Sequence, residues 1–203
     1  MMKVGLTGGI CTGKTIVGLM FVDLGCRLVD SDRITHELFE PGEKVYKSVV
    51  ANFGERIQDA EGRIDRSLLG EIVFHDIDSR QKLNNLVHPA VIQRQKEFLE
   101  SVEAEETTLV AIVDAALMIE VGTYKNYDRL IVVTCTTEQQ RQRLHERYSL
   151  GDEQIEARIA SQMPVEEKVG YADFIIDNSG SLEETRGQVI EVYESLKEVA
   201  GDY

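Results

Sequence analysis

The sequence has little cysteine, a shortage of positive charge and no long run of apolar residues. Its 36 aspartates and glutamates outnumber its 22 lysines and arginines, which gives a formal net charge of −14. Because nucleic acids and acidic membranes bind basic surfaces, this charge argues against either as a general partner. An anionic ligand would therefore need a local cluster of cations.

The three cysteines, Cys11, Cys26 and Cys135, are odd in number and widely spaced. They match neither a metal-ligand pattern nor a disulfide framework, so we expect a protein of the reducing cytoplasm. The longest apolar stretch, 109–119, contains Asp114 and is far shorter than the roughly 20 residues that a membrane span needs. No signal peptide is recognisable at the N-terminus. The expected protein is cytoplasmic, with no membrane or nucleic-acid partner and no signal for an oligomeric state.

Five short apolar runs predict β-strands, at 3–7, 26–30, 109–114, 129–133 and 173–177. Most are continuous rather than alternating, as expected for a parallel sheet with helices on both faces. Between and after them, stretches such as 14–25 and 181–200 predict helices, the second with a capping box at Ser181 and Glu184. The pattern predicts a three-layer α/β fold around a parallel five-stranded sheet.

Two segments interrupt the alternation of strand and helix. Residues 33–107 have helical periodicity without a clear strand, and they are too long for a simple crossover, so we expect a helical insertion. A smaller insertion with an arginine-rich start, 138–168, lies between the fourth and fifth predicted strands. Both are expected to lie within one domain, 1–203.

A phosphate-binding loop is predicted near the N-terminus. The stretch GLTGGICTGKT, from Gly5 to Thr15, contains the pattern G-x-x-x-x-G-K-[ST], between a predicted strand and a predicted helix. The loop amides and the helix N-terminus would hold phosphates, Lys14 would reach the outer phosphates, and Thr15 would bind Mg²⁺. We therefore predict an ATP site formed by Gly8, Gly9, Ile10, Cys11, Thr12, Gly13, Lys14, Thr15 and Ile16.

Acidic residues follow two other predicted strands, at the edge where open α/β sheets bind ligands. Asp30 and Asp32 are two apart, so an extended chain would point both side chains the same way. A carboxylate here can take a proton from a substrate hydroxyl; alternatively, Ser31 or Asp32 caps the next helix. Asp114 can hold the metal through water, although an aspartate at a strand end is also a common turn residue.

Basic residues gather in the second insertion, as Arg141, Arg143, Arg147 and Arg158. Such a cluster can close over a phosphoryl group during its transfer. Neighbouring glutamates equally fit a solvated helix, which we favour for Arg141 and Arg143, whereas a functional role is favoured for Arg147. Outside this cluster, His88 precedes Pro89 and predicts a turn or a helix start, where a single histidine is more often structural than catalytic.

The phosphate loop alone fits a kinase, a GTPase or an ATPase. A GTPase should carry N-K-x-D near its fourth or fifth strand, and the sequence contains none. The letters D-x-x-G occur at 177–180, but they follow the last predicted strand, the wrong place for a switch. A motor ATPase would normally be longer. The two insertions therefore favour a small-molecule kinase.

Six stretches, taken in order, are more specific than the loop alone. They are GLTGGICTGKT, DLGCRLVDSDRITHEL, FGERIQDAEGRIDRSLLGEIVF, LVHPAVI, QRLHERYSLGDEQIEARIASQMPVEEK and YADFIIDNSGS. With them the chain resembles the dephospho-coenzyme A kinase family nearly end to end. The resemblance implies ATP-dependent phosphorylation of the ribose 3′-hydroxyl of dephospho-coenzyme A, the last step of coenzyme A synthesis. It also implies a nucleotide core, a coenzyme-A-binding insertion at 33–107 and a lid at 138–168.

Two alternatives stay open at this point. The first is another nucleoside or nucleotide kinase of similar build. The second is a nucleotide-binding regulator without turnover, which would keep the loop but release no ADP in response to an acceptor.

The resemblance also implies roles for particular residues. Asp32 matches the aspartate proposed to take the hydroxyl proton, and Arg147 matches the lid arginine; with Lys14 they form the predicted catalytic set. His88 matches the family's His-Pro, and Thr7 matches the threonine before the double glycine; with Asp32 they form the predicted acceptor site. The last match, Asn178, falls where such kinases pass close to the adenine. The predicted metal ligands are Thr15 and Asp114.

The loop departs from the usual pattern of the family. Cys11 and Thr12 replace a glycine and a serine, and Thr15 replaces a serine while keeping the hydroxyl. Cys11 places a thiol beside the phosphates, which predicts sensitivity to alkylation. The stretch DAALMIE, 114–120, also differs from the family, which often has a proline and paired leucines before the glutamate at 120. This difference affects the expected packing around Asp114.

Overall fold

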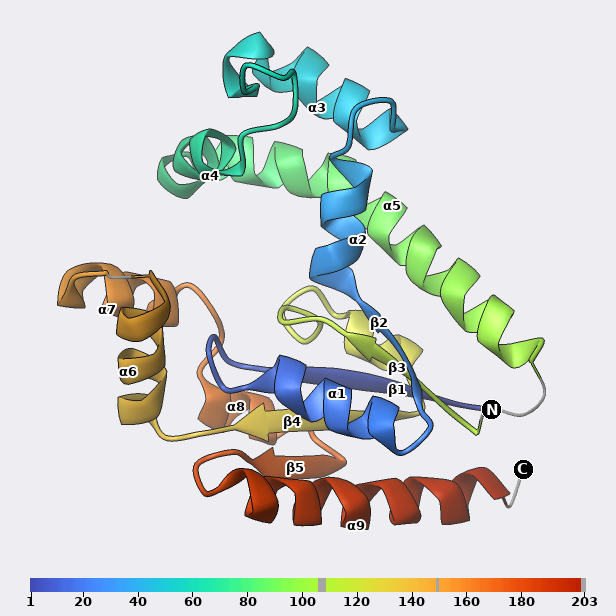
Figure 1. Cartoon of the computed structure of the whole chain (residues 1–203). Helices are drawn as coiled ribbons and strands as arrows, with labels where there is room; N and C mark the ends of the chain where they lie inside the picture. The colour runs from blue at the N-terminus through green and yellow to red at the C-terminus, as the bar shows by residue number, and fades with distance from the viewer. Residues whose placement is uncertain (106–108, 149, 202–203) are drawn as a thin grey trace. The chain divides into compact units, whose positions relative to one another are not determined.

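The computed structural model describes residues 1–105, 109–148 and 150–201. They contain one parallel sheet with the order β2-β3-β1-β4-β5 (Figure 1). Its strands are β1 (Met2–Gly8), β2 (Arg27–Asp30), β3 (Val110–Asp114), β4 (Arg129–Thr134) and β5 (Phe174–Asp177). All the predicted strands are confirmed, and each end lies within one residue of its prediction.

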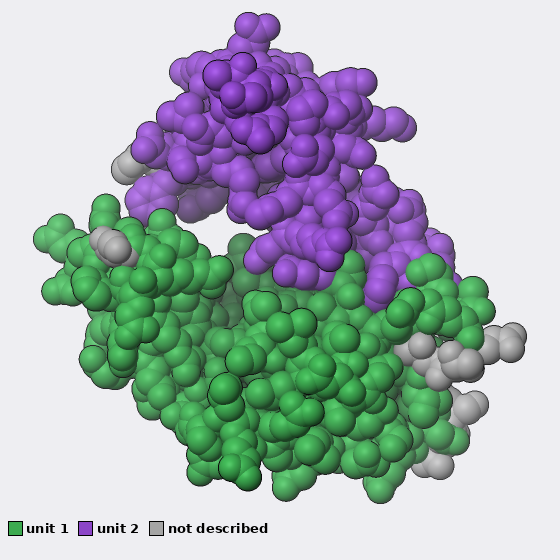
Figure 2. Space-filling view, viewed as in Figure 1, with its two compact units in different colours: residues 1–29, 101–203 green, residues 30–100 purple. Residues whose placement is uncertain are grey.

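The helices fall into two compact units, which Figure 2 colours separately. Unit 1, residues 1–29 and 101–203, contains α1 (Lys14–Asp23), α6 (Thr137–Tyr148), α7 (Asp152–Ala160), α8 (Val165–Val169), α9 (Leu182–Gly201) and the 3₁₀ turn η2 (Thr123–Asn126). Unit 2, residues 30–100, contains α2 (Ser31–Leu38), α3 (Lys44–Phe53), η1 (Glu55–Ile57), α4 (Arg66–His75) and most of α5 (Ile77–Glu103).

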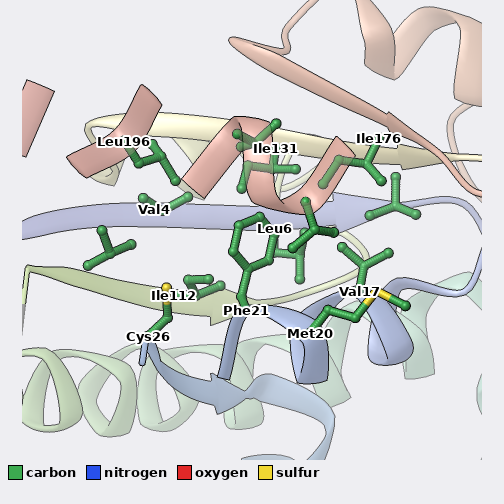
Figure 3. Packing of buried hydrophobic residues seen from close by; sticks show 14 of the residues in the cluster. Val4, Leu6, Val17, Met20, Phe21, Cys26, Ile112, Ile131, Ile176 and Leu196 are labelled. Atoms are coloured by element: carbon green, nitrogen blue, oxygen red, sulfur yellow. The ribbon is translucent and has the colours of Figure 1, made fainter. Parts of the chain in front are cut away.

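The three central strands of the sheet, β1, β3 and β4, are buried on both faces. On one face, α1 and α9 cover side chains such as Leu6 and Ile131, which pack with Phe21 in the main core (Figure 3). On the other face, Leu130 and Val132 pack against Met118 and Ile119 and against residues near η2 and α8. This double cover explains the continuous apolar runs and confirms the predicted three-layer fold.

The carboxyl ends of the parallel strands lie at one edge of the sheet. Gly8, the last residue of β1, pairs with Val133 of β4, and Asp114, the last residue of β3, pairs with Leu6. The last residue of β4 pairs with Asp177, the last of β5. The glycine loop after β1 therefore lies beside the segments that follow β3, β4 and β5, the position in which open α/β sheets bind ligands.

In unit 2, α2 begins earlier than the sequence predicts. Asp30 is its N-cap, and the Asp30 carboxylate accepts hydrogen bonds from the amides of Asp32 (2.8 Å) and Arg33 (3.3 Å). The extended arrangement of Asp30 and Asp32 is therefore wrong, because Asp32 already lies in the first helical turn. A cap at Ser31 or Asp32 is also wrong, since Asp30 satisfies these orphan amides.

His88 lies inside α5 and not at a turn or a helix start, so that prediction is wrong. The helix continues for 27 residues with Pro89 in its interior. Proline removes one backbone hydrogen bond of the helix. The buried side chains of Val87 and Val91 belong to the same stretch and favour its helical form through packing.

The predicted capping box before α9 and the predicted helical content of 33–107 can both be compared with the structure. Ser181 and Glu184 form the predicted capping box, since the Glu184 amide donates to Ser181 Oγ (3.2 Å) and the Ser181 amide donates to Glu184 Oε2 (2.7 Å). Of the predicted insertion, 33–107, the described part forms helices and one isolated bridge between Gln58 and Ile64. Its last residues, 106–107, lie outside the described residues, as does residue 149 of the predicted lid.

Within 1–105, 109–148 and 150–201, no helix combines the length and the apolar character needed to cross a bilayer.

Candidate active site

Two glycines of the loop between β1 and α1 occupy positions that disfavour other residues. Gly13 is the N-cap of α1, with φ 92° and ψ 18°, a left-handed conformation that suits glycine. A Cβ on Gly13 would overlap the side-chain amide of Asn178, and a Cβ on Gly8 would press against the carbonyl oxygen of Val133. The chain can therefore turn sharply into α1, whose first amides have no carbonyl ahead of them in the helix and can bind an anion.

The carbonyl oxygens of the loop are bound by side chains from distant segments. Gln140 Nε2 of α6 donates to the carbonyl of Ile10 (2.8 Å), and Asn178 Nδ2, which follows β5, donates to the carbonyl of Thr12 (2.8 Å). The carbonyl and amide of one peptide unit point in opposite directions. Holding the carbonyls against the protein therefore directs loop amides away from it, as a phosphate site requires.

Arg143 also holds the loop. Its Nη1 donates to the carbonyls of Cys11 (3.2 Å) and Thr12 (3.3 Å), and its Nη2 donates to the carbonyl of Asn178 (3.0 Å). The solvated position favoured for Arg143 from the sequence is therefore wrong, because the acceptors come from segments far away in the chain. The same interpretation is confirmed for Arg141, which is exposed and pairs with glutamates.

Lys168 of α8 is a buried cation beneath the start of the loop. Its side chain is fully buried, and Nζ lies 2.7 Å from the carbonyl oxygen of Ala116, 2.9 Å from Glu120 Oε1 and 3.5 Å from the carbonyl oxygen of Gly8. It thereby joins three segments of unit 1. Neither Lys168 nor Gln140 has a signal in its local sequence pattern that predicts this role. Lys168 is the last residue of one of the six stretches that carry the family resemblance, and Gln140 lies outside all of them.

Lys14, at the start of α1, forms an ion pair with Asp114 at the end of β3. The two side chains are 13% and 2% exposed, so the pair is largely shielded from water. The structure thus brings together the predicted phosphate-binding lysine and one predicted metal ligand. A low-polarity setting strengthens electrostatic interactions, so Lys14 is held firmly by Asp114 and would bind a phosphate that replaces this partner equally firmly.

The charges of three arginines act on the thiol of Cys11. Burial raises the pKa of this thiol above its ordinary value, although the guanidinium groups of Arg147, Arg143 and Arg158 act in the opposite direction. Cys11 itself has φ 56°, an uncommon conformation for a residue other than glycine. The cations therefore lie close enough to the loop for their charge to be felt there.

The other predicted nucleotide-site residues of unit 1 differ in exposure. Gly9 is buried, Ile10 is half-buried, and Thr15 and Ile16 are exposed on the first turn of α1. Asn178 is 4% exposed and also accepts a hydrogen bond from Thr185 Oγ1 (3.0 Å) through its Oδ1. In this structure Asn178 thus supports the loop backbone.

The predicted acceptor-site residues lie in both units. Thr7 is fully buried in unit 1, where its Oγ1 donates to the carbonyl of Ala116 (3.1 Å). Asp32 and His88 belong to unit 2, Asp32 exposed in the first turn of α2 and His88 half-buried in α5. Burial lowers the pKa of His88 below its ordinary value, so its imidazole is neutral at physiological pH.

The predicted metal ligands supply the kind of oxygen atoms that Mg²⁺ takes. Thr15 contributes a hydroxyl on the first turn of α1, and Asp114 contributes a carboxylate at the end of the adjacent strand β3. Among the described residues, no group of three or more His, Cys, Asp or Glu side chains could hold a metal ion by itself.

The fold and the loop define the class. The loop lies between the first strand and the first helix of a parallel sheet, with a lysine at the helix start, which is the phosphate-binding arrangement of P-loop nucleotide-binding proteins. A shikimate kinase from Bacteroides thetaiotaomicron has the same fold, with a TM-score of 0.51 over 97% of this chain and 98% of that one, at 15% identity.

Closer similarities identify the family. The family model described as dephospho-CoA kinase matches residues 2–184. A dephospho-CoA kinase of Aquifex aeolicus is 45% identical over 97% of this chain and 98% of its own length. The solved structure of a dephospho-CoA kinase from Campylobacter jejuni superposes with a TM-score of 0.72, at 28% identity, over 99% of this chain and 98% of that one. The chain therefore belongs to the dephospho-CoA kinase family.

Proposed function

We propose that this chain transfers the γ-phosphoryl group of ATP to the ribose 3′-hydroxyl of dephospho-coenzyme A, releasing ADP and coenzyme A. The observation that carries the proposal is the family match over residues 2–184, which includes the glycine loop, unit 2 and the arginine-rich segment. The other nucleoside and nucleotide kinases considered from the sequence are not favoured by these similarities.

At the donor end, the proposed ATP site is the loop from Gly8 to Ile16, with Asn178 near the adenine. The loop amides bind the phosphates, and Lys14 exchanges its ion pair with Asp114 for the outer phosphates. Arg147 neutralises charge that develops during the transfer. By analogy with arginine fingers, loss of Arg147 is expected to lower turnover by up to ~10³-fold.

At the acceptor end, the proposed base is Asp32. The capping role that would have occupied its carboxylate belongs to Asp30. A positioned general base contributes roughly 10²–10⁴-fold to rate. His88, neutral because burial lowers its pKa, is proposed to contact the acceptor as a hydrogen-bonding group. Thr7 is proposed to support the acceptor site through the Ala116 carbonyl to which it donates.

Thr15 and Asp114 are proposed to hold Mg²⁺ together with the phosphates, and the metal would supply positive charge to the transferring group. In-line transfer needs positioning and charge neutralisation more than covalent help, which agrees with a site built from loop amides and cations. The segments 33–107 and 138–168 are proposed to be the coenzyme-A-binding insertion and the lid. The proposed location is the cytoplasm, since the three cysteines are free thiols.

The proposal is tested by following ADP release from Mg-ATP with and without dephospho-coenzyme A. Adenosine, AMP and pantothenate serve as control acceptors. Release that depends on dephospho-coenzyme A alone, with a product heavier by one phosphoryl group, is the expected result. Release with another acceptor would discard the proposed substrate, and ATP binding without release would favour a regulator that does not turn over.

A further inference from the structure

The four arginines of the segment 141–158 have different partners. Arg141 is bound to Glu156 (Nε to Oε1, 2.6 Å) and lies near Glu138, and Arg143 is bound to loop carbonyls. Over the described part of the chain, neither Arg147 nor Arg158 has a carboxylate partner within 4.0 Å. Two of the four cations are therefore left for an external anion.

These two arginines share one aromatic ring. The Cζ atom of Arg147 lies 5.3 Å from the centroid of the Tyr148 ring, and the Cζ atom of Arg158 lies 5.0 Å from it. A guanidinium over an aromatic face is attracted by the ring, so each contact helps to hold its arginine in place. The ring therefore brings two positive charges to one place, which favours the binding of a polyanion there.

The pair is connected to the phosphate loop by geometry. Arg143 and Arg147 are four residues apart on α6, so they lie on one face of the helix. Arg143 binds the carbonyls of Cys11 and Thr12, which fixes this face of α6 beside the loop. The charges of Arg147 and Arg158 both act on the Cys11 thiol, as expected if both guanidinium groups lie near the loop.

We propose that Arg158 is a second phosphate-binding arginine of this site and that Tyr148 is a positioning residue, whose ring holds Arg147 and Arg158 together as a two-guanidinium clamp. The ligand is the outer, doubly charged end of the ATP triphosphate, so the inference rests on the proposed function. The arginines contact the ligand, whereas Tyr148 acts only through them. A planar guanidinium can bind phosphate oxygens with two parallel hydrogen bonds, which a lysine cannot reproduce.

The clamp is tested first with Arg158→Ala and Arg158→Lys, with Arg141→Ala as the matched control. The control removes an arginine of the same segment whose partners are surface glutamates. We expect turnover to fall by about 10²-fold in Arg158→Ala, since one transition-state donor is worth that much, and to recover only in part in Arg158→Lys. Added guanidinium ion should restore part of the turnover of Arg158→Ala but not change that of Arg141→Ala.

The positioning role is tested with Tyr148→Phe and Tyr148→Leu. Phenylalanine keeps the aromatic face, so turnover should stay near that of the parent, whereas leucine should lower kcat while the KM for dephospho-coenzyme A changes little. In the Arg158→Ala background, Tyr148→Leu should have a smaller effect, because one of the two groups that it positions is already gone. Equal losses in Tyr148→Phe and Tyr148→Leu would overturn the role of the ring.

Affinity for a non-hydrolysable ATP analogue separates this inference from the proposed function. If the parent protein does not phosphorylate dephospho-coenzyme A, but Arg158→Ala weakens analogue binding and Arg141→Ala does not, the clamp stands and the proposed substrate fails. If Arg158→Ala matches the parent in both turnover and analogue affinity while retaining its far-ultraviolet circular dichroism, the clamp is wrong.

Discussion

At the scale of the residue, the conformation of the loop backbone explains the glycine at position 13. Gly13 combines a positive φ with a close approach to the side chain of Asn178, whereas Gly122 has a positive φ of 76° and open space where its Cβ would be. The two positions therefore separate the cost of the left-handed conformation from the cost of a steric overlap.

We predict that Gly13→Ala destabilises the protein more than Gly122→Ala does. The left-handed conformation should cost either variant about 1–2 kcal/mol, and only Gly13→Ala adds an overlap with Asn178. Urea unfolding of both variants measures the difference. Asn178→Ala in the Gly13→Ala background should recover part of it, and equal losses at positions 13 and 122 would contradict the steric explanation.

Cys11 is the residue at which chemical modification should report on the site. Burial raises its pKa, so its reactive thiolate is scarce at neutral pH and becomes more abundant as the pH rises. We predict that iodoacetamide inactivates the enzyme faster at pH 9 than at pH 7, and that ATP protects it. The measurement is the fraction of starting activity that remains over time.

Two cysteine variants give the control for this prediction. Cys11→Ala should slow the inactivation, whereas Cys26→Ala should leave it unchanged, because Cys26 is 3% exposed and burial raises its pKa to about 12. If the Cys11→Ala protein is inactivated as fast as the parent, the modification takes place at another residue.

At the scale of the element, α6, α8 and β5 together hold a loop that belongs to none of them. Lys168 is the deepest of these contacts, since it joins α8 to the end of β1 and to the segment after β3. Removal of one member of a buried ion pair leaves the other charge without compensation. The position of the loop therefore depends on helices that follow it in the sequence by more than a hundred residues.

We predict that Lys168→Met lowers the free energy of unfolding by about 3–5 kcal/mol, because it leaves Glu120 and two carbonyl groups without their lysine. Lys197→Met, at a surface pair with Glu194, is the matched control and should change stability by less than about 1 kcal/mol. Urea denaturation gives both values. Replacement of Glu120 by Gln in the Lys168→Met background should restore part of the loss, and equal effects at 168 and 197 would refute the buried role.

At the scale of the whole molecule, the chain is acidic and its phosphate site is not. The chain has a net charge of −14, yet five cationic side chains of unit 1 contact the loop or act on it through their charge. They are Lys14, Arg143, Arg147, Arg158 and Lys168. The negative charge elsewhere does not prevent anion binding, because salt screens exposed charges beyond about 8–10 Å. Nucleotide binding should therefore depend on this local cluster and stabilise the folded state as a whole.

We predict that Mg-ATP at about 100 times its Kd raises the melting temperature by roughly 5–10 °C, from about 2.7 kcal/mol of binding linkage in a chain of this size. Lys14→Ala should abolish most of this shift, and Lys96→Ala, at a surface pair with Glu100, should keep it. Calorimetric melts with and without nucleotide make the comparison. A full shift in Lys14→Ala would show that the loop lysine is not needed for binding.

The strands, the glycine loop and the family are all predicted correctly from the order of the amino acids. These features are local: continuous apolar runs reflect a sheet covered on both faces, and phosphate binding needs glycines, a lysine and a hydroxyl at fixed spacing. The capping box at Ser181 is local in the same sense, and the structure confirms it.

The side chains that support the loop, and the residue that caps α2, become clear only in the folded chain. Arg143 and Arg141 have the same local setting, yet one binds three carbonyls and the other pairs with glutamates. Likewise Asp30, rather than Ser31 or Asp32, caps the helix. The hydrogen bonds from Arg143 to Cys11 and Thr12 join residues more than a hundred positions apart, so they depend on strand order and helix packing, which leave no periodic signal in the sequence. The cap is a local contact, but three neighbouring residues could form it, and the end of β2 at Asp30 selects one of them.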